Sequence, residues 1–382
     1  KKTIISFSIW LMAMVLFTPC TEAQTWQAGV PVETIFTGTG GRIGQYTSLV
    51  VANGNPAFVY YDETRGDLMY VRATDVSGTT WGTPVIVDSA GNVGQHGSLI
   101  IVSGNPAIAY YDVTNGDLKY VRASDASGTT WGTPVTIDAT GTTGWFICML
   151  IVNSNPAIAY YDNTNGDLRY VRASNATGSS WGTPVTVEST NDVGSWPSMA
   201  IVSGNPAISY YTNTSTDLKY VRASDASGST WGSPITLAST GTVGQWNTLL
   251  VVDGNPAISY YYGSANFDLM YIRATDATGT TWGTPVTVYA TGSTGNFTRM
   301  LIVKNNPAIC FADATNVDLK FVRATDVSGT TWGTPVTPDA GSSGIYSGMV
   351  IVNGNPAISY YENVGFKTRY VRADDDSGST WG

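Results

Sequence analysis

The chain has 382 residues, with 42 Gly, 17 Pro, 12 Trp and 22 Tyr, but only 12% charged residues and a single His. Hydrophobic residues make up 42% of it, which is enough to build a core and excludes an intrinsically disordered protein. The net charge of −9 would repel a phosphate backbone, so we expect no nucleic-acid partner, and one His excludes a His-rich metal centre.

Residues 1–23 have the organisation of a secretory signal peptide. Two lysines precede an apolar run from Ile4 to Phe17, and Thr21-Glu22-Ala23 offers small residues at the two positions that a signal peptidase reads, with cleavage expected after Ala23. An uncleaved anchor and lipid attachment at Cys20 are the alternatives, although a Pro precedes Cys20 where a lipobox needs Gly or Ala. We therefore expect a secreted protein, extracellular, cell-surface or periplasmic, that does not span a membrane after cleavage.

An internal repeat of 50 residues, with one insertion near Ala265, dominates the rest of the sequence. The tract Tyr-Val-Arg-Ala recurs with small changes, and its Arg falls at Arg72, Arg122, Arg172, Arg222, Arg273, Arg323 and Arg372. Nine residues later each copy has Trp-Gly, with the Trp at Trp81, Trp131, Trp181, Trp231, Trp282, Trp332 and Trp381. Seven copies cover almost the whole chain after the signal peptide.

Each copy is predicted to form four short strands, because runs rich in Val, Ile, Tyr and Thr alternate with turn residues. In the second copy these strands are Ser98–Val102, Ala107–Asp112, Leu118–Ala123 and Thr133–Asp138. Four strands in a unit of this length are typical of a propeller blade. The sequence therefore predicts an all-β, seven-bladed β-propeller with four antiparallel strands per blade; a β-solenoid is the alternative.

The seventh copy ends at Trp381-Gly382, before its fourth strand. The segment from Val30 to Ile35, which follows Thr25-Trp26, echoes Thr130-Trp131-Gly132-Thr133-Pro134-Val135, with two extra residues before its Pro-Val pair. We expect this N-terminal strand to complete blade seven, because closing the ring leaves no open sheet edge. Residues 24–382 would then form a single domain, which we expect to be a monomer.

The loop from Arg72 to Trp81 resembles the Asp-box repeat of sialidase-like bacterial propellers, Ser-x-Asp-x-Gly-x-Thr-Trp. Gly78, Thr80 and Trp81 match that motif, whereas Asp75 stands one residue too far upstream. The resemblance implies structural boxes on the face opposite an active site. The residue chemistry agrees, because an Asp can accept backbone N–H groups in the loop while the Trp packs between blades.

We expect no catalytic residue, since seven equal copies of Arg, Trp and Asp lack the asymmetry that catalysis needs. A sialidase-like site would require three Arg, a Tyr–Glu pair and an Asp acid, and only four Glu follow the signal peptide. No phosphate-binding loop, nucleophile elbow or zinc-ligand pair is present, so we expect no metal and no cofactor. A sialidase-like glycoside hydrolase is kept as an alternative.

The copies differ most just before their first strands, where a Gly is followed two residues later by an aromatic ring. The residues at that position are Tyr46, His96, Phe146, Trp196, Trp246, Phe297 and Tyr346. Loops at this position would place the rings around one mouth of the channel, where aromatic faces and nearby polar groups suit sugars. The sequence thus predicts a non-catalytic propeller that binds extracellular glycan or a surface polymer, with Trp196 and Trp246 as first candidates.

Three alternatives remain open. The rings could plug the channel or pack between blades, and the propeller could be a scaffold for a surface protein. The turns bracketed by Asp62/Asp67, Asp112/Asp117 and Asp162/Asp167 could hold calcium, because they bring carboxylate and amide oxygens together. Ordinary capping of a hairpin turn explains those Asp residues with fewer assumptions.

Overall fold

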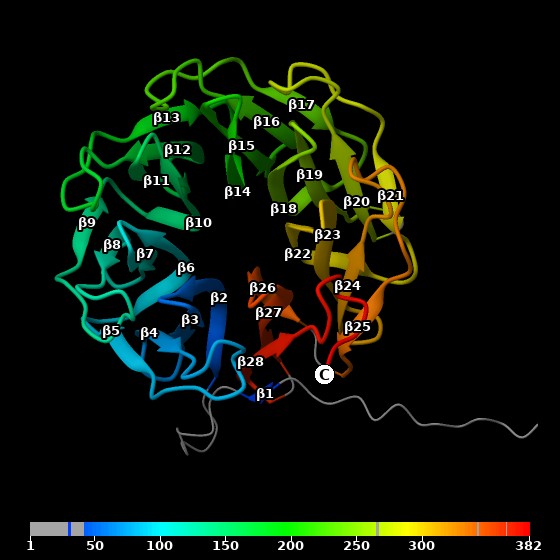
Figure 1. The fold of residues 1–382 in the computed structure, drawn as a ribbon. Helices are drawn as coiled ribbons and strands as arrows, with labels where there is room; N and C mark the ends of the chain where they lie inside the picture. The colour runs from blue at the N-terminus through cyan, green and yellow to red at the C-terminus, as the bar shows by residue number, and fades with distance from the viewer. Residues whose placement is uncertain (1–29, 32–41, 265–266, 342–343, 364) are drawn as a thin grey trace, which may run out of the picture.

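The structure is a computed structural model that describes residues 30–31, 42–264, 267–341, 344–363 and 365–382. Within these ranges it consists of strands and loops, and no helix is present that could cross a membrane. Seven four-stranded sheets are arranged around a central channel (Figure 1), which confirms the predicted seven-bladed propeller. The predicted signal peptide and Val32–Ile35 lie outside the described residues.

The first strands of the blades are β2 (Ile43–Ala52), β6 (Val93–Val102), β10 (Thr143–Val152), β14 (Val193–Val202), β18 (Val243–Val252), β22 (Thr294–Val303) and β26 (Ile345–Val352). The second strands are β3 (Asn55–Asp62), β7 (Asn105–Asp112), β11 (Asn155–Asp162), β15 (Asn205–Thr212), β19 (Asn255–Tyr262), β23 (Asn306–Asp313) and β27 (Asn355–Glu362). The third strands are β4 (Asp67–Arg72), β8 (Asp117–Arg122), β12 (Asp167–Arg172), β16 (Leu218–Arg222), β20 (Asp268–Arg273), β24 (Asp318–Arg323) and β28 (Lys367–Arg372). The outer strands are β5 (Val85–Asp88), β9 (Val135–Asp138), β13 (Val185–Glu188), β17 (Ile235–Ala238), β21 (Val286–Tyr289), β25 (Val336–Asp339) and β1 (Val30–Pro31).

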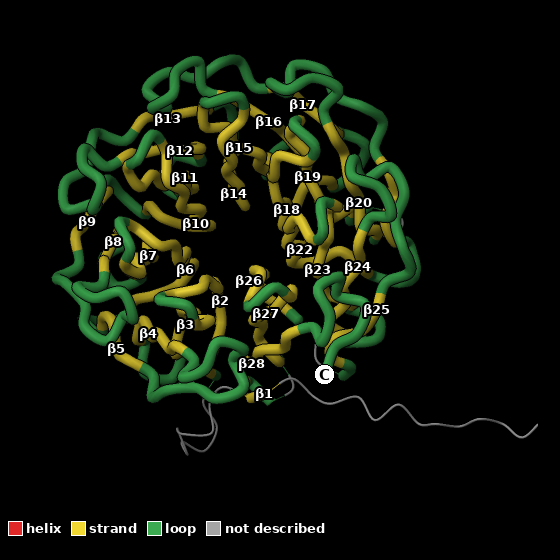
Figure 2. Tube along the Cα trace, viewed as in Figure 1, coloured by secondary structure: helices red, strands yellow, loops and turns green. Residues whose placement is uncertain are grey.

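Within each blade the strands are antiparallel, and the first strand lies innermost, beside the channel (Figure 2). The register of blade two pairs Val102 with Asn105 at one end and Val93 with Asp112 at the other. Turns between second and third strands therefore lie on the same face as the loops that enter the first strands. We call this the upper face; the loops between third and fourth strands lie on the lower face.

The core is distributed between neighbouring blades. One hydrophobic cluster joins Val59 and Tyr70 of blade one to Leu99, Ile108 and Val121 of blade two, and six further clusters of the same kind follow around the ring. Because a blade is covered on both sides, its second strand is buried over almost its whole length, as in β7. This double burial explains the nearly continuous apolar runs in the sequence.

The Asp-box-like loops hold neighbouring blades together on the lower face. Asp125 accepts hydrogen bonds from the backbone N–H groups of residues 127, 129 and 130, at 2.9, 3.2 and 2.8 Å. The Trp131 ring packs edge-on against Tyr70 of the preceding blade, with ring centroids 5.2 Å apart. The Tyr70 hydroxyl donates to the Ser127 carbonyl at 3.1 Å. The expected structural role of the Asp and the Trp is confirmed.

The same contacts close the ring between blades seven and one. Trp81 packs against Tyr370 at 5.1 Å, and β1 adds to β28 by pairing Val30 with Tyr370. Val30 takes the position that Val135 occupies opposite Tyr120 in blade two, so the register starts two residues earlier than the Pro-Val alignment suggested. Closure by an N-terminal strand is confirmed with this correction.

We expect Asp125→Ala to lower the free energy of unfolding by about 1–2 kcal/mol, because three loop N–H groups lose their acceptor. Burial alone would raise the pKa of Asp125, but the hydrogen bonds from Thr130 and Thr129 outweigh it and lower the pKa, so the native loop favours the carboxylate. Asn175 replaces the Asp in blade three and accepts two backbone N–H groups at 3.2 Å. Urea unfolding should therefore show a smaller loss for Asn175→Ala; equal losses would contradict the role of the charge.

Candidate functional site

The seven predicted aromatic residues meet at the upper end of the channel and form one closed ring, which we call the aromatic ring. Each side chain contacts the next across a blade boundary. The centroid distances are 4.5 Å for Tyr46–His96, 5.0 Å for His96–Phe146, 4.7 Å for Phe146–Trp196, 5.4 Å for Trp196–Trp246, 5.0 Å for Trp246–Phe297, 5.1 Å for Phe297–Tyr346 and 4.6 Å for Tyr346–Tyr46. The structure thus brings together every ring that the sequence singled out.

A bulge in each first strand places these rings, and in blades one to six the strand carries two bulges. In blade two Val93 pairs with Asp112, Gln95 with Tyr111 and Ser98 with Ala109, so the first strand carries an extra residue in each interval. The ring residues adopt positive φ, between 49° and 58°, which is unusual for residues other than Gly. The Gly two residues before each ring residue is needed because a side chain would not fit there. In blade two a Cβ on Gly94 would lie 2.9 Å from the Leu68 Cα of the neighbouring blade.

A second set of rings supports the aromatic ring from the second strands. Tyr211 and Tyr261 lie edge-on to Trp196 and Trp246, each at 5.4 Å. In four more blades a second-strand Tyr lies behind the ring residue, with ring centroids 6.3 or 6.4 Å apart. Blade six has Ala312 in place of this Tyr. Six of the seven ring residues are therefore held by neighbours on both sides and by a tyrosine behind them, and Phe297 is held by its two neighbours in the aromatic ring.

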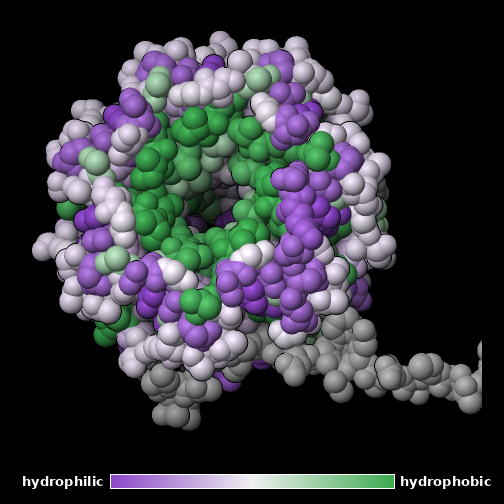
Figure 3. Space-filling view, in the orientation of Figure 1, coloured by the Kyte–Doolittle hydropathy of each residue, from purple (hydrophilic) through white to green (hydrophobic). Residues whose placement is uncertain are grey.

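The aromatic ring walls a cavity of about 440 Å³ rather than filling the channel. Its members are half-buried. Figure 3 shows that the channel is open, with a hollow at the centre of the face that it draws. The rings contact one another, as the packing interpretation expects, and they also leave an accessible space, as the binding interpretation requires. The cavity volume lies within the range of about 300–1,000 Å³ that small-molecule sites usually have.

The residue that follows each ring residue in the chain is polar in four adjacent blades and not in the other three. In four adjacent blades this side chain donates a hydrogen bond to the backbone carbonyl of the ring residue in the preceding blade. The four bonds are Thr47 to Tyr346 at 2.5 Å, Asn247 to Trp196 at 2.9 Å, Thr298 to Trp246 at 2.7 Å and Ser347 to Phe297 at 2.8 Å. The other three blades have Gly97, Ile147 and Pro197 there. Of these residues Thr47 and Asn247 line the cavity together with Arg299, and we call that side its polar half. Gly97, Ile147, Pro197 and Trp145 line the other side, its apolar half, where Gln95 is the polar residue.

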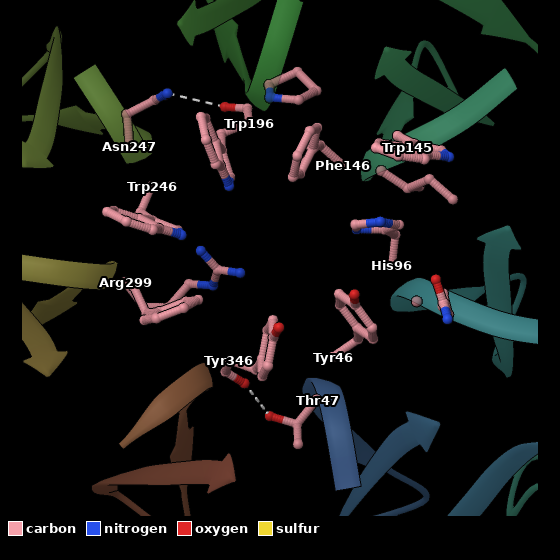
Figure 4. Close-up of a pocket in the computed structure, with 15 residues that line it drawn as sticks. Tyr46, Thr47, His96, Trp145, Phe146, Trp196, Trp246, Asn247, Arg299 and Tyr346 are labelled. Atoms are coloured by element: carbon pink, nitrogen blue, oxygen red, sulfur yellow. Dashed lines mark hydrogen bonds between the residues drawn. The ribbon is translucent and has the colours of Figure 1, made fainter. Parts of the chain in front are cut away.

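Arg299 is the charged residue of the cavity wall, and no Asp or Glu is among the described residues that line it. Figure 4 shows its guanidinium reaching toward the middle of the aromatic ring, and its Nη1 donates to the Thr298 carbonyl at 3.1 Å. The Arg299 side chain is exposed to the channel. The protein around it lowers the pKa of Arg299, although the thiols of Cys310 and Cys148 act in the opposite direction. The indole nitrogens of Trp196 and Trp246 also face the cavity in Figure 4.

The titratable members of the aromatic ring are neutral at pH 7. Burial lowers the pKa of His96 to about 3. Burial and the neighbouring Tyr346 raise the pKa of Tyr46 above its usual value. The ring therefore presents uncharged aromatic surfaces, and the positive charge of the cavity resides on Arg299.

Arg299 was not among the predicted site residues, although the sequence contains a signal for it. The equivalent positions in the other six copies hold small residues, namely Ser48, Ser98, Cys148, Ser198, Thr248 and Gly348. Comparison of the copies two residues after the ring position marks Arg299 as the exception. The sequence could not show that its side chain reaches the rings, because they belong to different blades.

The turns between second and third strands show hairpin capping, as the simpler interpretation predicted. The carboxylate of Asp112 accepts from the backbone N–H of Asn115 at 3.1 Å and from its side-chain amide at 2.9 Å. Lys119 pairs with the same carboxylate at 2.8 Å. The described part of the chain contains no group of three His, Cys, Asp or Glu side chains arranged to hold a metal ion.

Comparison with known proteins gives no match to a family model and none to a curated protein sequence. Among solved structures, the polysaccharide lyase Uly1 is 12% identical, with a TM-score of 0.56 over 85% of this chain and 88% of the lyase. A protein of unknown function from Dyadobacter fermentans is 14% identical, with a TM-score of 0.51 over 78% of this chain and 94% of its own. The NanB sialidase of Streptococcus pneumoniae also matches, at 12% identity and a TM-score of 0.47 over 89% of this chain and 69% of the sialidase. The first two similarities show a shared propeller fold.

We expect His96 to make native stability depend on pH between about 6.5 and 3. The unfolded chain binds a proton on this residue below its usual pKa of 6.5, whereas the folded protein does not until about pH 3. The free energy of unfolding should therefore fall as the pH falls, by at most about 1.4 kcal/mol per pH unit from this group.

His96→Phe is the matched variant, because Phe146 and Phe297 occupy the same position with positive φ. Urea unfolding of both proteins at several pH values should show a shallower pH dependence for the variant. Parallel curves would contradict a buried, neutral His96, as would a His96 NMR signal that titrates near pH 6.5.

Proposed function

We propose that this protein is a secreted, non-catalytic propeller that binds extracellular saccharide in the cavity of the aromatic ring. One observation carries the proposal: seven aromatic side chains form a closed ring around a cavity of about 440 Å³ that is apolar on one side and polar on the other. A sugar has the same two-sided character, since its C–H face is apolar and its edge carries hydroxyl groups.

Stacking on aromatic faces would supply most of the affinity. Sugar C–H groups pack against aromatic rings, and the indoles of Trp196 and Trp246 add N–H donors directed into the cavity. The rings are held by their neighbours and by the second-strand tyrosines, so little side-chain entropy would be lost on binding. A polymer with repeated units would bind more strongly if several parts of the ring were engaged together.

The cavity wall offers rings and N–H donors rather than the pair of carboxylic acids that glycoside hydrolysis commonly uses. This composition favours binding over turnover. A sialidase-like hydrolase is the second candidate, and a scaffold for a surface protein is the third. A protein partner would be expected to cover the whole upper face, whereas the polar and apolar groups converge on one cavity of small-molecule size.

We expect Trp196→Asn and Trp246→Asn to weaken saccharide binding at least about tenfold each, because each removes one stacking surface. Asn is preferred to Ala because it adopts positive φ more readily, so the bulge is preserved. Ligands would be found on a glycan array and their affinities measured by isothermal titration calorimetry. Product analysis of the same mixtures would detect any hydrolysis.

Trp231→Phe is the control, since Trp231 packs against Tyr170 on the lower face and not in the cavity. It should leave the affinity unchanged. Unaltered affinity in both cavity variants would refute this site, and turnover of an array ligand would establish the hydrolase instead. An array without any bound glycan would favour the protein scaffold.

A further inference from the structure

We propose that the cavity recognises an anionic substituent of its saccharide, a carboxylate or a sulfate, and that Arg299 binds it. This inference rests on the proposed function and adds the chemical class of the ligand. Its basis is the position, charge and surroundings of a single side chain that breaks the sevenfold repetition of the channel wall.

Arg299 has no structural counterpart in the other blades. The six equivalent residues are small, and in three blades their hydroxyl accepts a backbone N–H from the next first strand, as Ser98 does from Met149 at 3.0 Å. Thr248 instead donates to the Thr298 carbonyl at 2.9 Å. The channel wall is therefore built without a long basic residue, and Arg299 extends into the cavity beyond what closure of the ring requires.

The charge of Arg299 has no anionic partner among the described residues. The ion pairs that arginines form within the described residues are those of Arg65, Arg169, Arg273 and Arg369, and Arg299 forms none. The guanidinium of Arg299 donates its one hydrogen bond to the neighbouring carbonyl of Thr298. His96 and the Tyr46 and Tyr346 hydroxyls face the same space without charge at pH 7. Glu63, whose charge acts on Tyr46 and Tyr346, is exposed, lies outside the cavity lining and accepts a hydrogen bond from Gln45 at 3.2 Å.

Two further donors face the cavity, beside Gln95, His96 and the Tyr46 and Tyr346 hydroxyls, which can donate or accept. The indole N–H groups of Trp196 and Trp246 face its centre, and no hydrogen bond to the described residues engages them. Asn247 is not available, because its amide nitrogen binds the carbonyls of Trp196 and Gly244. A ligand that satisfies these donors must bring acceptor oxygens, and a carboxylate or sulfate matches the planar fork of an Arg with two of them.

A cationic ligand fits this cavity poorly, although aromatic cages often hold cations. The guanidinium reaches toward the middle of the aromatic ring, so a second positive charge there would be repelled at short range. A bound anion, in contrast, would give the charge of Arg299 a partner within the cavity. The apolar half of the wall remains free to contact the sugar ring.

The test compares saccharides that differ only in the acidic group. The probes are trigalacturonate with its methyl ester, 3′-sialyllactose with lactose, and 6-sulfo-N-acetyllactosamine with the unsulfated disaccharide. For the wild-type protein we expect at least one acidic member to bind tenfold or more tightly than its neutral partner in calorimetry. The pair that shows this difference also distinguishes carboxylate from sulfate recognition.

Arg299→Thr is the main variant, because Thr248 shows that the blade accepts Thr at this position. We expect it to abolish the preference for the acidic member, so that the two members of the pair bind with similar affinity. Arg299→Lys keeps the charge without the planar fork and should retain part of the preference. Urea unfolding would establish that both variants are folded.

The outcomes separate this inference from the proposed function. Equal binding of acidic and neutral members by the wild type would overturn the role of Arg299 and leave saccharide binding intact. The same conclusion follows if Arg299→Thr keeps the acidic preference. Absence of binding to all six probes and to the glycan array would overturn both proposals.

Discussion

The structure depends on the contacts that join each blade to the next. A Trp from the loop before each fourth strand packs against the aromatic residue of the preceding blade's third strand, and the pair Trp81–Tyr370 completes the circuit. Because the core lies between blades rather than within them, no blade can bury its apolar faces alone. Closure of seven blades fixes where every first strand lies, and with it which side chains face the axis.

The candidate site follows from that closure. A bulge repeated in every first strand turns one residue of each blade toward the axis, so seven separate positions become one ring. The blades share the position of this ring residue but not its identity, and the adjoining positions differ even more. Shared residues build the propeller, while the cavity acquires its polar half, its apolar half and its single Arg from the positions where the copies differ.

Much of the fold could be predicted from the sequence, because the information is repeated. Seven copies of the same strand and turn pattern predict seven blades, and the missing outer strand predicts closure by the N-terminal segment. The register of that strand could not be derived, since both Val30 and Val32 fit the pattern; pairing of Val30 with Tyr370 decides between them.

The site was predictable in part for the same reason. Alignment of the copies identified the seven ring positions, and the structure brings them together. The alignment could not show whether the rings leave a cavity or fill the channel, because that depends on distances between side chains of different blades. Arg299 stands out in the sequence as a varying neighbour of the rings, but it was not predicted as a site residue, because its significance appears only where six small residues and seven rings surround it.

The most direct test of the account is NMR of the indole N–H groups in protein labelled at Trp, with each signal assigned by single Trp→Phe variants. Trigalacturonate, 3′-sialyllactose and 6-sulfo-N-acetyllactosamine would be added in turn. The account predicts that at least one probe shifts the signals of Trp196 and Trp246, while those of the inter-blade residues Trp81, Trp131, Trp181, Trp231, Trp282, Trp332 and Trp381 stay in place. Shifts confined to the inter-blade indoles, or unchanged spectra with all three probes, would contradict it.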